Sequence, residues 1–205
     1  MMNTTGIEIE TKFHVRDLKK IETRLQALGA QLVQPRQFEQ NLRFDLPDGS
    51  LRKTYRVLRL RQDEKAVLTY KGPGSNAVDG IRSREEWEVI VSDFATTQKI
   101  LESLGYDIQF LYVKYRTTYT LKNSHVMLDE MPFGLFVEIE GEKQSDVLNL
   151  AEHLNLDKDG AIPDSYQVLF ERVKDALGLS FRDLTFDNFT GIDVPDSALG
   201  VKCSD

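Results

Sequence analysis

The sequence lacks several features that mark common classes of protein. It has one cysteine in 205 residues, Cys203, so it offers neither an intramolecular disulfide nor a cluster of thiolates. It has no run of 18 apolar residues, and its first residues lack the basic and apolar regions of a secretory signal. We therefore expect a cytoplasmic protein with no membrane partner and no cysteine nucleophile.

Positive charge is in the minority. The chain has 26 Lys and Arg against 33 Asp and Glu, which gives a formal net charge of -7. Because nucleic acids and anionic membranes attract net basic surfaces, we expect no nucleic acid partner. Any polyanion would therefore have to be bound by a local group of bases. We expect a small-molecule ligand, and a protein that is a monomer or a homodimer.

The hydrophobic periodicity predicts both helices and strands. Apolar residues recur at helical spacing over about 18–28, 93–104, 145–154 and 166–177. A period of two predicts eight strands, at 6–14, 38–46, 55–62, 65–71, 82–91, 110–121, 124–130 and 135–141. The stretch KGPGSNAVDGIRS predicts a long loop between two strands. We expect one domain over 1–184 and an irregular tail over 185–205, which is polar and without a period.

Most of the predicted strands have one charged face. In IEIETKFHV, Glu8, Glu10 and Lys12 point one way, while Ile7 and Phe13 point the other way. One such strand is usually a surface strand, but the pattern returns along the chain. Together the charged faces hold seven bases (Lys12, Arg59, Arg61, Lys71, Arg84, Lys114, Arg116) and seven acids (Glu8, Glu10, Glu86, Glu88, Asp129, Glu138, Glu140).

The two faces of these strands suggest an architecture. If helices cover the apolar faces, the charged faces must line a shared wet interior, as a closed barrel provides. Arginine and lysine side chains that converge there suit a chain of phosphates, and paired carboxylates suit Mg2+ or Mn2+. The pattern therefore indicates an α+β fold, a β-barrel with helices packed outside, and a metal-dependent phosphoryl- or nucleotidyl-transfer site.

This set of motifs resembles the CYTH family, also called triphosphate tunnel metalloenzymes, which contains class IV adenylate cyclases, thiamine triphosphatases and inorganic triphosphatases. The ExExK motif stands at Glu8 to Lys12, and the remaining motifs follow in family order over residues 7–141. They are RxR at Arg59 and Arg61, the lysine of YKG at Lys71, RxExE from Arg84 to Glu88, KxR at Lys114 and Arg116, and D...ExE at Asp129, Glu138 and Glu140. The resemblance implies an eight-stranded antiparallel tunnel whose substrate is a triphosphate.

The resemblance also implies roles for these residues. All seven bases would bind the triphosphate, and Lys12, Glu86 and Glu88 are the candidate catalytic residues, the two glutamates completing a metal shell or orienting water. The implied ligands of Mg2+ or Mn2+ are Glu8, Glu10, Asp129, Glu138 and Glu140. Arg43 or Arg52 could reach the tunnel mouth. We expect Trp87 in the core and His14, His125 and His153 in structural or surface positions.

Three functions remain open from the sequence. The favoured one is metal-dependent hydrolysis of inorganic tripolyphosphate, thiamine triphosphate or a nucleoside triphosphate. The second is class IV adenylate cyclase, which converts ATP to cyclic AMP and pyrophosphate with the same bases and metals. The third is a module that binds triphosphate or polyphosphate without catalysis, against which the five predicted metal-ligating carboxylates argue.

Overall fold

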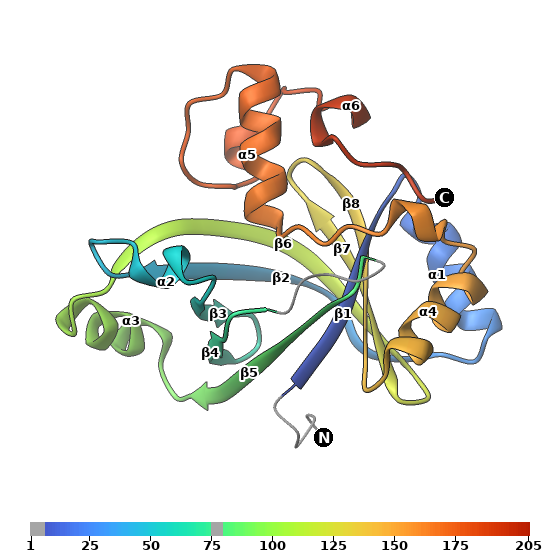
Figure 1. The fold of residues 1–205 in the computed structure, drawn as a ribbon, viewed down its shortest axis with the longest axis horizontal. Coiled ribbons are helices and arrows are strands. Elements are labelled where there is room, and N and C mark those ends of the chain that lie inside the picture. Colours follow the sequence, from blue (N-terminus) through green and yellow to red (C-terminus); the bar gives the residue numbers. More distant parts are fainter. Residues whose placement is uncertain (1–6, 75–79) are drawn as a thin grey trace.

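Eight antiparallel strands form one closed barrel (Figure 1). The structure is a computed structural model that describes residues 7–74 and 80–205, without the side chains of Ile7 and Glu8. In chain order the strands are β1 Ile7–Val15, β2 Gln31–Asp45, β3 Val57–Gln62, β4 Ala66–Lys71, β5 Arg82–Val91, β6 Asp107–Leu121, β7 Ser124–Met131 and β8 Gly134–Gly141. They neighbour one another in the order β1-β5-β4-β3-β2-β6-β7-β8. The predicted α+β class and eight-stranded antiparallel barrel are confirmed.

The four longer helices match the predicted helical segments. They are α1 Leu18–Ala27, α3 Phe94–Ser103, α4 Gln144–His153 and α5 Tyr166–Leu177. Asp17 and Asp93 cap two of them, since each carboxylate accepts a hydrogen bond from a backbone N–H of the first turn. The sequence analysis missed two short helices, α2 Ser50–Lys53 and α6 Asp196–Leu199, and two 3-10 turns, Lys158–Gly160 and Asp187–Phe189.

Two apolar clusters cover the outside of the barrel. In Figure 1, α1 and α4 lie together on one side of the barrel and α3 lies on the other. The first cluster joins Ile21 of α1 and Val147 of α4 to outward residues of the strands, such as Phe13 and Ile139. The second joins Leu101 of α3 to Leu60 and its neighbours on β2 and β3. Alternation along the strands therefore leaves the opposite side chains to line the interior.

A third apolar cluster closes part of one end of the barrel. Phe110 and Phe136, which share the parity of the charged residues, pack there with Tyr166 of α5. The last residues of the chain, expected to form an irregular tail, contain little regular structure but contribute Phe189 and Leu199 to this cluster. The interior is therefore not ionic throughout, because α5 and the C-terminal segment bury their apolar side chains against this end.

The outer face of β5 departs from the prediction. Trp87 points away from the barrel interior, as expected, but 59% of its surface is exposed, so its predicted place in the core is wrong. Val89, on the same face of β5, is exposed as well. The predicted loop after β4 falls partly on residues 75–79, outside the described residues. In the described part of the chain, no helix is both long and apolar enough to span a membrane.

Candidate active site

Strand pairing brings the predicted charged residues opposite one another. Across β1 and β8, Lys12 is the partner of Glu138 and Glu10 is the partner of Glu140. Arg116 lies opposite Asp129 across β6 and β7, and Lys71 lies opposite Glu86 across β4 and β5. Glu8 is in register with Arg84, although the side chain of Glu8 lies outside the described ones. Directly opposed side chains in a sheet are close enough for contact. The alternating charged residues of neighbouring strands therefore form ion pairs.

The most buried of these charges form a connected group around Asp129. Its carboxylate, 0% exposed, accepts hydrogen bonds from Arg116 Nε at 2.6 Å, Lys114 Nζ at 3.1 Å and Tyr166 Oη at 2.7 Å. Arg116 also pairs with Glu138. We call this group the inner network; it consists of Lys12, Lys114, Arg116, Asp129, Glu138 and Tyr166.

The start of α5 holds Lys12 within the inner network. Lys12 Nζ lies 3.2 Å from Glu138 Oε1, donates to the backbone oxygen of Asp164 at 3.2 Å, and stands 4.2 Å from the centre of the Tyr166 ring. A small pocket beside it is lined by residues that include Glu10, Arg82 and Asp164. Strand alternation gave no signal for Tyr166, because its position depends on how α5 packs over the end of the barrel.

The electrostatics of the inner network favour an ionised Glu138 and a neutral Tyr166. Burial acts to raise the pKa of Glu138, but the charges of Lys12 and Arg116 outweigh burial and hold that pKa well below its usual value. Burial and the negative charge of Asp129 raise the pKa of Tyr166 well above its usual value, so its hydroxyl stays a donor. Each acid of the inner network therefore has at least two of its bases in contact.

Sequence reasoning missed a buried acid on β2. Glu39 is 2% exposed, and its carboxylate lies 3.6 Å from Lys114 Nζ, 3.9 Å from Arg61 Nη1 and 2.8 Å from Asn41 Nδ2, which donates to it. Burial acts to raise its pKa, but Lys114, Arg116 and Arg61 lower the pKa to about 2. Alternation along β2 puts Glu39 on the same face as Arg43, so the period of two could have identified it.

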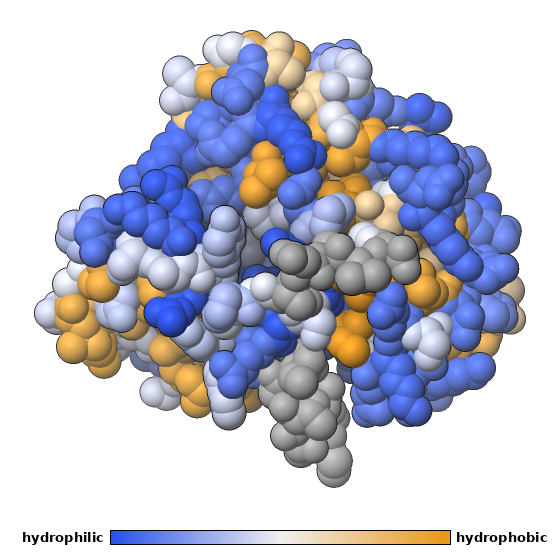
Figure 2. Space-filling model, in the orientation of Figure 1, coloured by the Kyte–Doolittle hydropathy of each residue, from blue (hydrophilic) through white to orange (hydrophobic). Residues whose placement is uncertain are grey.

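A second group of charges lies on β1, β2, β3, β4 and β5. Arg59 Nη2 is 3.5 Å from Glu88 Oε1, which also accepts from Thr69 Oγ1 at 2.8 Å. We call this the mouth group; it consists of Glu10, Arg43, Arg59, Thr69, Lys71, Arg84, Glu86 and Glu88. Its ion pairs include Arg84 with Glu10 at 3.5 Å and Lys71 with Glu86 at 2.9 Å. Figure 2 shows hydrophilic residues around a hollow in the middle of this face of the molecule.

Arg43 makes the mouth group rich in positive charge. It lies opposite Arg59 in the register of β2 and β3, and its guanidinium donates to Gln167 Oε1 of α5 at 2.6 Å. Among the residues that the structure describes, it forms no ion pair with an acid. Burial lowers the pKa of Arg43, and the positive charges of Arg84 and Arg59 lower it further. Several cations that repel one another inside a barrel are typical of an anion site.

The carboxylates differ in how well they fit a divalent cation. Asp129 and Glu138 are already bound by bases of the inner network, and within the described side chains no three acids, histidines or cysteines lie close enough to hold a metal. Glu10 and Glu140 lie opposite each other across β1 and β8. Among the described side chains of the predicted ligand set, Glu10 and Glu140 are the two acids that lie directly opposite each other, and carboxylate oxygens suit Mg2+ or Mn2+.

The histidines lie apart from both groups of charges. His14 is buried against Phe136, with ring centroids 5.4 Å apart, and burial lowers its pKa. His125 is exposed, and so is His153, whose Nδ1 lies 2.6 Å from the backbone oxygen of Asn149 in the same helix. These positions agree with structural or surface roles.

The fold and its interior define a closed antiparallel barrel lined by paired acids and bases. The family model described as the CYTH domain matches residues 6–166, so the chain belongs to the CYTH family. None of the curated proteins compared matches the chain.

Solved structures share the fold. A proposed adenylate cyclase from Vibrio parahaemolyticus is similar with a TM-score of 0.73 and 19% identity, over 81% of this chain and 98% of that one. The PH1012 protein from Pyrococcus horikoshii has a TM-score of 0.66 and 25% identity, over 78% and 96%. A proposed adenylyl cyclase from Hippeastrum, reported to have a dominant triphosphatase activity, has a TM-score of 0.61 and 20% identity, over 80% and 95%.

Proposed function

We propose that this protein is a divalent-metal-dependent triphosphatase that binds its substrate inside the barrel. The observation that supports this most is the convergence of Arg43, Arg59 and Arg84, where burial and like charge lower the pKa of Arg43. A triphosphate would relieve this repulsion, because arginine and lysine side chains hydrogen-bond phosphate oxygens. Membership of the CYTH family agrees with this substrate class.

The two groups of charges have different tasks in this proposal. The mouth group binds the phosphate chain, and Lys71 and Arg84 exchange their contacts with Glu86 and Glu10 for contacts with phosphate oxygens. The inner network positions Lys12 through Glu138 and Tyr166, so that its ammonium stabilises negative charge on the leaving diphosphate. Lys114, Arg116 and Arg61 contribute positive charge from deeper in the barrel.

The acids of the mouth group supply the remaining chemistry. Glu88 is held by Thr69 and Arg59, in a position to orient a water molecule and take its proton, with Glu86 as the neighbouring candidate. The water oxygen forms a bond to the terminal phosphorus while the bond from that phosphorus to the bridging oxygen breaks, which releases phosphate and diphosphate. Glu8, Glu10 and Glu140 would hold Mg2+ or Mn2+, which neutralises charge on the phosphates when bound.

Class IV adenylate cyclase remains the second candidate. The stretch LDEMPFGLFVEIEG, which covers β7 and β8, looks like that branch of the family. The same cations would then bind ATP with its α-phosphorus facing the ribose 3′-hydroxyl, and pyrophosphate would leave.

Product analysis tests the proposal. The purified protein is incubated with tripolyphosphate, thiamine triphosphate and ATP, each with Mg2+ or Mn2+, and phosphate, pyrophosphate and cyclic AMP are separated. We expect phosphate from at least one substrate, and much less from the Glu88→Gln variant than from the control Glu85→Gln, which alters the neighbouring outward side of β5. Cyclic AMP with pyrophosphate would identify the cyclase, and no product with any substrate would refute both enzymes.

A further inference from the structure

A short helix is fixed at the end of the barrel where the mouth group lies. Asp45, the last residue of β2, has the same parity as Glu39 and Arg43, which face the interior. Its carboxylate accepts hydrogen bonds from the backbone N–H groups of Leu51 and Arg52, each at 2.9 Å. These bonds hold α2 against this end of the barrel.

Tyr55 follows α2 in an unfavourable backbone conformation. Its φ of 58° is in the left-handed region, and its N–H bonds to the backbone oxygen of Arg52 at 3.0 Å, which ends the helix. Glycine or asparagine is the usual residue at such a position, because a larger side chain strains the backbone. Strained residues often lie at functional sites. A tyrosine at this position therefore suggests that its side chain has a role besides ending the helix.

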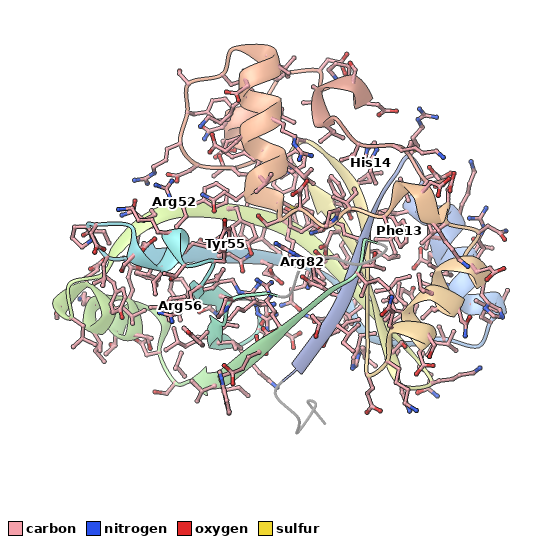
Figure 3. The ribbon with its side chains drawn as sticks, viewed as in Figure 1. Phe13, His14, Arg52, Tyr55, Arg56 and Arg82 are labelled. Carbon is pink, nitrogen blue, oxygen red and sulfur yellow. The ribbon has the colours of Figure 1, made fainter. Side chains whose placement is uncertain are left out.

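The Tyr55 side chain contributes little to the packing of the fold. Its surface is 80% exposed, the highest value among the large hydrophobic side chains described as exposed. In the view of Figure 3, Tyr55 lies between Arg52 of α2 and Arg82 of β5. Arg59 of the mouth group is four positions further along the chain, so the Cα atoms of the two residues are no more than about 14 Å apart. An exposed aromatic ring therefore stands within a short reach of the proposed phosphate site.

We propose that Tyr55, which follows the exposed Arg52 of α2, binds a flat aromatic ring that the triphosphate substrate carries. This rests on the proposed function, since the mouth group must bind the phosphates. Aromatic side chains stack on rings of this kind, and an arginine adds a cation–π contact. A longer inorganic polyphosphate could form an ion pair with Arg52, but it has no ring that could stack on the phenol ring of Tyr55. The substrate class is therefore a triphosphate ester with an aromatic ring, such as a nucleoside or thiamine triphosphate, rather than inorganic tripolyphosphate.

Calorimetry with two non-hydrolysable probes separates ring binding from phosphate binding. The probes are β,γ-methylene ATP and the bis-methylene analogue of triphosphate, each titrated with Mg2+. We expect Tyr55→Ala to weaken binding of the ATP analogue about five- to hundredfold, the range for loss of one stacked ring. Binding of the triphosphate analogue should change by no more than about twofold. Tyr55→Phe should retain the wild-type affinity, because the ring is kept.

Trp87→Ala is the matched control, since it removes another exposed aromatic side chain, on the outer wall of the barrel, and should leave both affinities unchanged. Competition of thiamine triphosphate with the ATP analogue then shows which of the two rings binds more tightly. Equal effects of Tyr55→Ala on both probes, or no effect on either, would overturn the subsite while leaving the phosphate site intact. Failure of the wild-type protein to bind either probe would refute the proposed function as well.

Discussion

The inner network and the mouth group are built from the same residue types but differ in how completely their charges are satisfied. In the inner network, Asp129 is fully buried and its oxygens receive bonds from three donors. In the mouth group, Arg59 and Glu88 are 3.5 Å apart and both partly exposed, and Arg43 repels its neighbouring arginines. Each group has one more base than acid, but every base of the inner network contacts an acid, whereas Arg43 of the mouth group forms no ion pair with a described acid.

This difference changes the interpretation of the family motifs. The resemblance implies that Asp129, Glu138 and Glu140 of the D...ExE motif ligate metal; in the structure Asp129 and Glu138 contact bases, and Glu140 lies opposite Glu10. Burying charges is costly unless each has partners, so the inner network is a rigid support rather than a source of large net stability. Its value is that it holds Lys12 and Arg116 in fixed positions.

Asp129→Asn should give the largest effect, because it removes the acid that balances two buried bases. We expect the free energy of unfolding to fall by about 3–5 kcal/mol, the usual cost of breaking a buried ion pair. Urea denaturation measures this, with Glu130→Gln as the control, since Glu130 pairs with Arg36 nearer to solvent. The control should change stability by less than about 1 kcal/mol. Equal losses would mean that the inner network is no more important to the fold than a surface pair.

Acid should lower the stability of the fold over a pH range set by the pKa of Glu39. Its pKa of about 2 in the folded state lies below the ordinary value of 4.5, so its stabilising effect is complete above pH 4.5 and is lost as pH falls toward 2. The shift corresponds to about 3 kcal/mol. Glu39→Gln should be less stable at neutral pH, because it leaves Lys114 and Arg61 without this carboxylate.

Urea denaturation at several pH values tests this dependence. Between about pH 5 and pH 3, wild-type stability should fall more steeply than that of Glu39→Gln. The exposed Glu152, changed to glutamine, should give a variant with the same slope as the wild type. Parallel curves for Glu39→Gln and the wild type would show that Glu39 does not titrate below its ordinary pKa.

Arg59→Ala should give a smaller effect, and one that falls on binding rather than on stability. Loss of a charge-assisted contact is worth about 1.5–3 kcal/mol, or roughly ten- to hundredfold in the Kd for tripolyphosphate. Arg36→Ala, which removes an arginine from the outer wall, should leave that Kd unchanged. An equal loss of affinity in both variants would mean that Arg59 acts only through the overall charge of the protein and not through a contact in the mouth group.

Local patterns predicted the barrel well because alternation fixes which side chains share an interior. Alternation placed Lys12, Arg59 and Glu88 on charged faces that line one interior, without knowledge of which strands are neighbours. It could not show that Tyr166 donates to Asp129, since α5 follows the last strand and packs over the end of the barrel through long-range contacts. It could not divide the charges into two groups either, because burial depends on which end of the barrel α5 and the C-terminal segment cover.

A crystal structure with tripolyphosphate and Mn2+ would test the division between the two groups most directly. Anomalous scattering locates the manganese, and the phosphates are visible at ordinary resolution. We predict phosphate oxygens on Arg43, Arg59 and Arg84, manganese beside Glu10 and Glu140, and Asp129 still bound to Arg116 and Lys114. Manganese on Asp129, with those two bases turned toward the phosphates, would contradict the account, because the inner network would then be the ligand site.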